Sequence, residues 1–216
     1  MHLAFAIVAA LLLQAPDAVV SQAEREEGFV PLFDGRSLNG WQTIPLGKSP
    51  GRWEVRDGVL THAEGDSWIA TQATYTDFVL RLEYRTGPES DSGIFLRSPA
   101  SGYPSFTGME MEIRNDPAGE PSPRSNTSIY GAAAPRRNVT RPAGEWNEVE
   151  ISLVKRRLVV TCNGEVIHDL NLDDPAYSAA LRGPLSDRAK SGHIGFQAHL
   201  EGTPVEFRRV RVRVVR

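Results

Sequence analysis

Apolar and polar residues alternate with period two along most of the chain after residue 28, and this alternation sets narrow limits on the fold. In DFVLRLEYR (77–85) the apolar members on one face are Phe78, Leu80, Leu82 and Tyr84. A strand shows this pattern when only one of its sides is buried. Gly, Pro, Asn or Asp interrupt the alternation at short intervals, and no apolar stripe with helical spacing exceeds about two turns. The sequence therefore predicts an all-β chain.

Many short strands bury their apolar faces by packing two sheets together, so we expect a two-sheet antiparallel jelly-roll sandwich of the lectin-like type, one domain over residues 28–216. Asn163-Gly164 lies between two alternating runs and predicts a tight hairpin. In PVEFRRVRVRVV (204–215) the alternation slips once, at Arg208 and Arg209. A β-bulge there would restore the phase.

The first segment, MHLAFAIVAALLLQAPDAVVSQAE, has the features of a secretory signal peptide, predicted over residues 1–23. Its apolar run from Leu3 to Leu13 is too short to span a bilayer, and Ser21 and Ala23 are small residues suited to a cleavage site. His2 stands where such signals usually carry Lys or Arg, so a buried N-terminal helix is the alternative.

The charge and motif content excludes several classes of protein. A net charge of -3 and a pI near 6.0 provide no field to attract nucleic acid or an anionic membrane. Cys162 is the only cysteine, so it has no internal disulfide partner. No P-loop, GxGxxG after a strand, HExxH, GxSxG or CxxC occurs. Together with the predicted signal peptide, these features lead us to expect a periplasmic or secreted soluble protein.

Polar side chains from GIFLRS (93–98), GMEMEIR (108–114) and GHIGFQAHL (192–200) are predicted to share one sheet face. Those suited to orienting hydroxyl-rich ligands are Arg97, Glu110, Glu112, Gln197 and His199, with His193 on the same side. Glycines at 93, 108 and 195 would let a ligand approach the backbone. Ring faces for sugar stacking are available from Phe95, Tyr103, Phe106 and Tyr130. An ordinary solvated sheet face is the alternative interpretation.

Glu110 and Glu112 stand at i and i+2 of a strand, which places their carboxylates about 7 Å apart, a separation compatible with paired acid and base roles in glycoside chemistry. Arg97 would instead neutralise the pair if the role were binding alone. A Ca²⁺ or Zn²⁺ site of Glu110, Glu112 and His199 is a further alternative, although no metal-motif spacing is present and no cofactor is predicted.

Nine segments in order resemble the 3-keto-disaccharide hydrolase family. They are FVPLFDGRSLNGW (29–41), WEVRDGVL (53–60), YTDFVLRLEY (75–84), SGIFLR (92–97), GMEMEIRND (108–116), SIYG (128–131), PAGEWN (142–147), SGHIGFQAH (191–199) and PVEFRRVRV (204–212). The resemblance implies a concanavalin A-like jelly roll, an exported protein, and chemistry on glycosides already oxidised at C3.

The resemblance implies that the polar face binds 3-keto-glycosides or oligosaccharides. Glu110 or His199 would act as base or acid, and Arg97 would lie near developing negative charge. Substrate contacts are expected from Glu112, Gln197, Phe95, Tyr130 and His193. The alternatives are a non-catalytic carbohydrate-binding module that uses the same face, or an ordinary glycosidase acting on unoxidised sugar.

Overall fold

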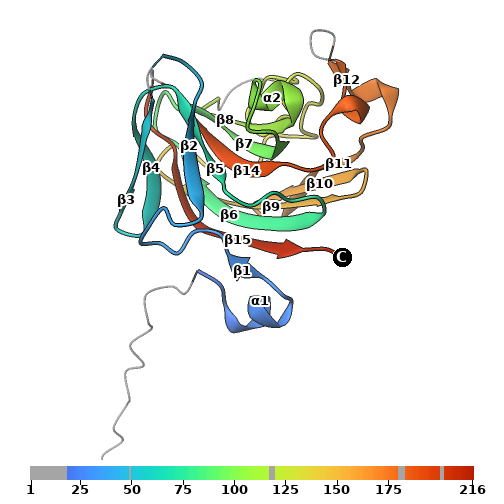
Figure 1. The fold of residues 1–216 in the computed structure, drawn as a ribbon. Coiled ribbons are helices and arrows are strands. Elements are labelled where there is room, and N and C mark those ends of the chain that lie inside the picture. The colour runs from blue at the N-terminus through green and yellow to red at the C-terminus, as the bar shows by residue number, and fades with distance from the viewer. Residues whose placement is uncertain (1–18, 49, 117–119, 180–182, 200–201) are drawn as a thin grey trace, which may run out of the picture.

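A computed structural model of the chain describes residues 19–48, 50–116, 120–179, 183–199 and 202–216. Two antiparallel sheets pack face to face, with α1 on the outer side of one sheet and α2 on the outer side of the other (Figure 1). The predicted all-β, two-sheet antiparallel sandwich is confirmed.

In the described part of the chain the larger sheet, called sheet A, has eight strands. In spatial order they are β11 (Glu165–Asn171), β10 (Arg157–Cys162), β9 (Trp146–Val154), β6 (Phe78–Arg85), β15 (Glu206–Val214), β4 (Val59–Glu64) and β3 (Arg52–Arg56), with β1 (Val30–Pro31) paired to β15. Short elements near one end are η1 (Pro175–Tyr177), β12 (Ser178–Ala179), β13 (Gly183–Pro184) and η2 (Leu185–Asp187).

The smaller sheet, called sheet B, carries the candidate site. In spatial order its described strands are β2 (Trp41–Pro45), β5 (Ser67–Thr71), β14 (His193–Ala198), β7 (Asp91–Ser98) and β8 (Met109–Arg114). The one-turn helix α2 (Pro104–Thr107) connects β7 to β8 and lies over the outer face of this sheet (Figure 1). Among the described residues, no helix has the length and apolar character needed to cross a membrane.

The core lies between the two sheets and follows the predicted alternation. Sheet A contributes the buried residues Phe78, Leu80, Leu82, Tyr84, Val149, Ile151 and Leu153, and sheet B contributes Ile94, Leu96, Met109, Met111, Ile113, Ile194 and Phe196. Cys162 is buried in the same core, and burial raises the pKa of its thiol to about 12 although Arg141 opposes the shift. The thiol therefore stays protonated and unreactive at neutral pH.

Both local irregularities predicted from the sequence are confirmed. Asn163 and Gly164 have φ angles of 49° and 84°, and they join Cys162 to its partner Glu165 in a tight turn of the type that Asn-Gly favours. The pairing of β15 with β6 shifts register between Arg208 and Arg211, with Arg209 at a φ of 51°. This bulge returns Val210 to the buried side.

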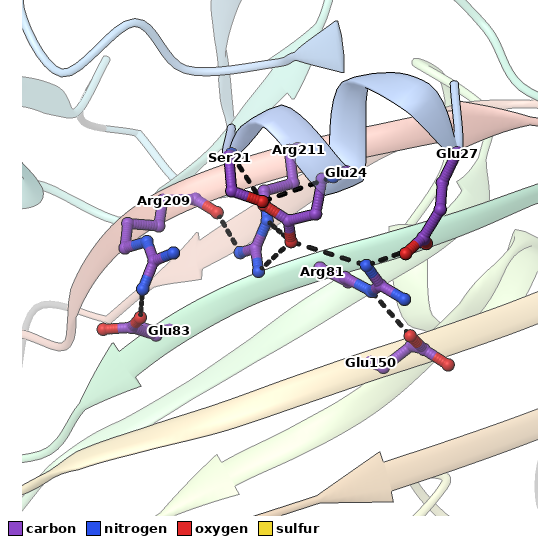
Figure 2. A network of polar contacts seen from close by, with 8 residues as sticks. All are labelled: Ser21, Glu24, Glu27, Arg81, Glu83, Glu150, Arg209 and Arg211. Carbon is purple, nitrogen blue, oxygen red and sulfur yellow. Dashed lines mark hydrogen bonds and ion pairs between the residues drawn. The ribbon is translucent and has the colours of Figure 1, made fainter. Parts of the chain in front are cut away.

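The segment before β1 is tied to the outer face of sheet A by α1 (Gln22–Glu26), whose first turn is closed by a capping box between Ser21 and Glu24. Figure 2 shows the Glu24 carboxylate between Arg211, 2.6 Å away, and Arg81, 3.4 Å away. Val20 is buried in a small apolar cluster beside this helix. Residues 1–18 of the predicted signal peptide lie outside the described residues, so its extent stays a prediction.

Burial on its own would raise the pKa of Glu24, but hydrogen bonds from Ser21 and Arg211 and the Arg211 charge lower this pKa to about 2. A carboxylate with a depressed pKa stabilises the fold above its unfolded pKa of about 4.3 and loses that contribution as pH falls toward 2. We therefore expect Glu24→Gln to lower the free energy of unfolding by roughly 3 kcal/mol at pH 7 and by less at pH 3. Urea denaturation of the full-length chain, which retains Ser21, measures this at both pH values.

The matched control for this prediction is Glu26→Gln on the same helix, because the Glu26 carboxylate is exposed and accepts a hydrogen bond from the Gln22 side chain. It should change stability by less than about 0.5 kcal/mol. An equal loss for Glu24→Gln at pH 7 and pH 3 would contradict the electrostatic explanation and indicate lost packing instead.

Candidate functional site

A small pocket opens on the outer face of sheet B, at the edge formed by β8. Its volume is about 230 Å³, and its lining residues are Asp91, Tyr103, Phe106, Glu110, Glu112, Arg114, Tyr130, Gln197 and His199. Glu110 and Glu112 face it because Met109, Met111 and Ile113 alternate with them and point into the core. Cross-strand pairing sets Phe95 beside Glu110 and Gly93 beside Glu112.

The two acids are not ordinary surface carboxylates. Glu110 is 3 % exposed, Glu112 is 4 % exposed, and Gln197 from β14 is 5 % exposed. Burying a carboxylate is costly unless polar or charged groups compensate it. A chain that places two such carboxylates in one pocket therefore carries a cost that packing alone does not explain, and such costs concentrate at functional sites.

Charged groups connect the carboxylates to His199 around the pocket wall. His199 Nε2 lies 3.8 Å from Asp91 Oδ1, Arg114 Nη2 lies 3.9 Å from Asp91 Oδ2, and Arg114 Nε lies 3.9 Å from Glu112 Oε1. These separations exceed hydrogen-bond length, so the coupling is mainly electrostatic. Asp91 was not among the residues predicted from the sequence, although it has the same strand parity as Gly93 and Phe95.

Gly93 makes the room in which the Glu110 side chain lies. A Cβ atom at residue 93 would be 2.1 Å from Glu110 Oε1 and 2.8 Å from Glu110 Cδ. The space beside the other two predicted glycines is also occupied by the protein. A Cβ at Gly195 would meet the Trp68 ring, and one at Gly108 would meet Ser98. The expectation that these glycines admit a ligand to the backbone is wrong, since they admit neighbouring side chains and backbone.

Part of the long loop after residue 116 fixes the edge of β8. Glu112 N donates to Ser128 O at 2.9 Å, Thr127 N donates to Glu112 O at 2.8 Å, and Tyr130 N donates to Glu110 O at 2.9 Å. Ile129 enters the core between these contacts, while Tyr130 reaches the pocket. The loop thereby satisfies an exposed strand edge and holds the backbone of both acids.

Arg97 is not in this pocket, so its predicted place beside Glu110 is wrong. Its φ of 49° and the register shift between β14 and β7 mark a bulge that turns the side chain away from the Phe95 face. The guanidinium is 1 % exposed and donates to Lys155 O at 3.0 Å and to Asp77 Oδ1 at 2.9 Å. It joins the end of β7 to the β9–β10 turn of the opposite sheet.

Phe95 and His193 also lie outside the pocket lining. Phe95 is buried in an apolar cluster on the outer face of sheet B and meets Trp68 edge to face, with ring centroids 5.4 Å apart. His193 Nδ1 is 2.7 Å from Thr71 O, and its ring also lies against Trp68. Both side chains pack beside the pocket and do not line it.

The structure brings together Glu110, Glu112, Gln197, His199 and Tyr130 of the predicted residues. It also brings Tyr103 and Phe106, two of the rings predicted for sugar stacking, to the pocket, and it adds Asp91 and Arg114. Within the described ranges, no group of three or more His, Cys, Asp or Glu side chains is arranged to hold a metal ion.

The sequence profile of the 3-keto-alpha-glucoside-1,2-lyase-like domain matches residues 28–213. The chain belongs to this family. A protein named 3-keto-disaccharide hydrolase from Bacteroides thetaiotaomicron is 23% identical over 231 residues, covering 88% of this chain and 79% of the relative. The resemblance noted in the sequence is therefore confirmed at the level of the 3-keto-alpha-glucoside-1,2-lyase-like family.

Solved structures of other proteins share the fold of this chain. A protein from Parabacteroides distasonis, named as a candidate glycosyl hydrolase, aligns with a TM-score of 0.79 at 23% identity and covers 93% of this chain and 100% of its own. A Bacillus subtilis protein described as having a galectin-like fold aligns with a TM-score of 0.56 at 16% identity, covering 87% of this chain and 96% of its own. At these identities the likeness establishes the lectin-like sandwich and nothing about activity.

Proposed function

We propose that the protein is an exported enzyme that cleaves 3-keto-glycosides by deprotonation at C2 followed by loss of the C1 substituent, with water completing the hydrolysis. Family membership supports the substrate class. The observation that carries the chemistry is the pair of nearly buried carboxylates, Glu110 and Glu112, beside an imidazole and a guanidinium in one pocket.

A ketone at C3 makes the C2 hydrogen acidic, and Glu110 is the base in this proposal. Its carboxylate accepts the C2 proton, and the electron pair of the broken C–H bond passes to the C3 oxygen as an enolate. Arg114 supplies the positive charge that stabilises this oxygen, in place of Arg97, which lies elsewhere. Glu112 and Gln197 hold ring hydroxyls.

The enolate then reforms the ketone while the C1–O bond breaks, and protonated His199 gives its proton to the departing oxygen. Asp91 Oδ1 lies 3.8 Å from Nε2 of this imidazole. Water adds to the resulting enone: its hydroxyl bonds to C1, its proton returns to His199, and Glu110 returns a proton to C2. The sum is hydrolysis, with every group restored.

Turnover in D₂O tests this proposal against the two alternatives. With a methyl glucoside oxidised at C3, we expect one deuterium at C2 of the released 3-keto sugar, read by mass spectrometry and NMR, because the proton returned to C2 comes from solvent-exchanged Glu110. The control is the same 3-keto sugar incubated with and without enzyme, which corrects for exchange after release. Cleavage without deuterium would indicate an ordinary glycosidase, and binding without product would indicate a carbohydrate-binding module.

A further inference from the structure

The pocket is too small for a whole disaccharide. Its volume of about 230 Å³ lies below the range of about 300–1,000 Å³ that encloses drug-sized ligands. A pocket of this volume has room for one sugar ring at most, so any second ring of a glycoside would extend past the pocket rim.

Two exposed aromatic rings occupy that rim. Tyr103 is 38 % exposed and Phe106 is 43 % exposed, with ring centroids 4.8 Å apart. In the described part of the chain, the large exposed hydrophobic residues are these two and three valines, Val30, Val166 and Val214. The large exposed aromatic residues of the described part of the chain therefore gather at the pocket.

The turn that carries the two rings is fixed to the body of the protein. Pro104 O accepts from Ser98 Oγ at 3.0 Å and from Gly108 N at 2.9 Å, and Thr107 O accepts from Ala189 N at 3.0 Å. Pro104 and Ser105 are buried beneath the exposed rings. A platform held in this way needs little ordering when a ligand binds.

Polar atoms border the rings on the side of the acids. Gln197 Nε2 donates to the Tyr103 hydroxyl at 3.4 Å, so the platform joins an apolar face to a polar edge. A pyranose has the matching surface, with C–H groups on its face and hydroxyls around its edge. A purely aromatic leaving group would use the ring faces but not this edge.

We propose that Tyr103 and Phe106 form the subsite for the second sugar ring of the substrate, the ring that leaves when the C1–O bond breaks. The inference rests on the proposed function for the identity of the first ring. It makes the protein selective for disaccharides over glycosides with a small leaving group.

Kinetics of Phe106→Ala and Tyr103→Ala on paired substrates test the subsite. The pair is maltose oxidised at C3 of its non-reducing ring and methyl α-glucoside oxidised at C3, which share the first ring. We expect KM for the disaccharide to rise about tenfold in each variant and KM for the methyl glycoside to change less than about twofold. Phe106→Tyr, which keeps the ring, should restore the disaccharide KM, and Val166→Ala, an exposed residue of β11, is the control.

Equal losses on both substrates, or no loss on either, would overturn the proposal. A larger rise in KM for a phenyl 3-keto-glucoside than for the disaccharide in these variants would also overturn it, because the platform would then serve aromatic leaving groups. If the wild-type protein turns over none of these compounds, the proposed function fails and calorimetric titration decides the subsite separately. Tighter binding of maltose than of methyl α-glucoside, lost in Phe106→Ala, would uphold it, and equal binding would overturn it.

Discussion

Replacing Glu110 with glutamine should lower kcat on a 3-keto-glycoside by about a thousandfold or more, with little change in KM. Glutamine keeps the shape and the hydrogen-bonding oxygen of the side chain but cannot accept the C2 proton, and positioned general bases contribute about 10²- to 10⁴-fold. Glutamine has nearly the same volume as glutamate, so the variant should stay folded. Initial rates on the C3-oxidised methyl glucoside, with thermal melts of the same samples, measure both effects.

Glu148→Gln provides the matched control, because Glu148 is an exposed carboxylate on β9 of the opposite sheet. It should leave kcat and KM unchanged. Turnover by Glu110→Gln within tenfold of the wild type would remove Glu110 as the base, and His199 would then be the remaining candidate for C2 deprotonation. Failure of deuterium to enter C2 at the same time would remove the elimination route altogether.

The alternation of side chains was sufficient to predict both sheets and the side of β8 on which the acids lie. Glu110 and Glu112 are placed correctly because strand parity is enforced by Met109, Met111 and Ile113 in the core. Parity fails where the backbone leaves the strand geometry. Arg97 adopts a positive φ without being glycine, and no local sequence signal marks that residue as the position of a bulge.

The rest of the site depends on contacts between distant segments, which alternation does not report. Tyr130 reaches the pocket because its loop pairs with β8 through Ile129, and the Tyr103–Phe106 platform depends on a bond from Ala189 to α2. Tyr130 and the Tyr103–Phe106 pair were nevertheless predicted as ligand contacts from their residue type alone. The glycines were predicted for the wrong reason, because Gly93 makes room for a carboxylate of the protein itself.

That use of Gly93 leads to a sharp expectation for Gly93→Ala, which should lower kcat about a hundredfold while the fold stays intact. The new Cβ would lie 2.1 Å from Glu110 Oε1, so the carboxylate must turn away from its position. The displaced atoms are Oε1, Cδ and Cγ of Glu110, which belong to a side chain and not to the backbone, and alanine in place of glycine reduces the entropy of the unfolded chain. A displacement of about 1 Å at a reacting group is enough for a loss of this size.

Gly195→Ala is the informative comparison, because the same substitution there meets atoms that cannot move aside. Its Cβ would lie 2.5 Å from Ile69 O and 2.5 Å from the Trp68 ring, so it should lower the free energy of unfolding by about 1–3 kcal/mol. Gly93→Ala should melt within a few degrees of the wild type and be nearly inactive, whereas Gly195→Ala should melt early and keep its activity per folded molecule at low temperature. Full activity in Gly93→Ala would mean that the position of the Glu110 carboxylate does not govern the reaction, and a melt as early as that of Gly195→Ala would mean that Glu110 has nowhere to turn.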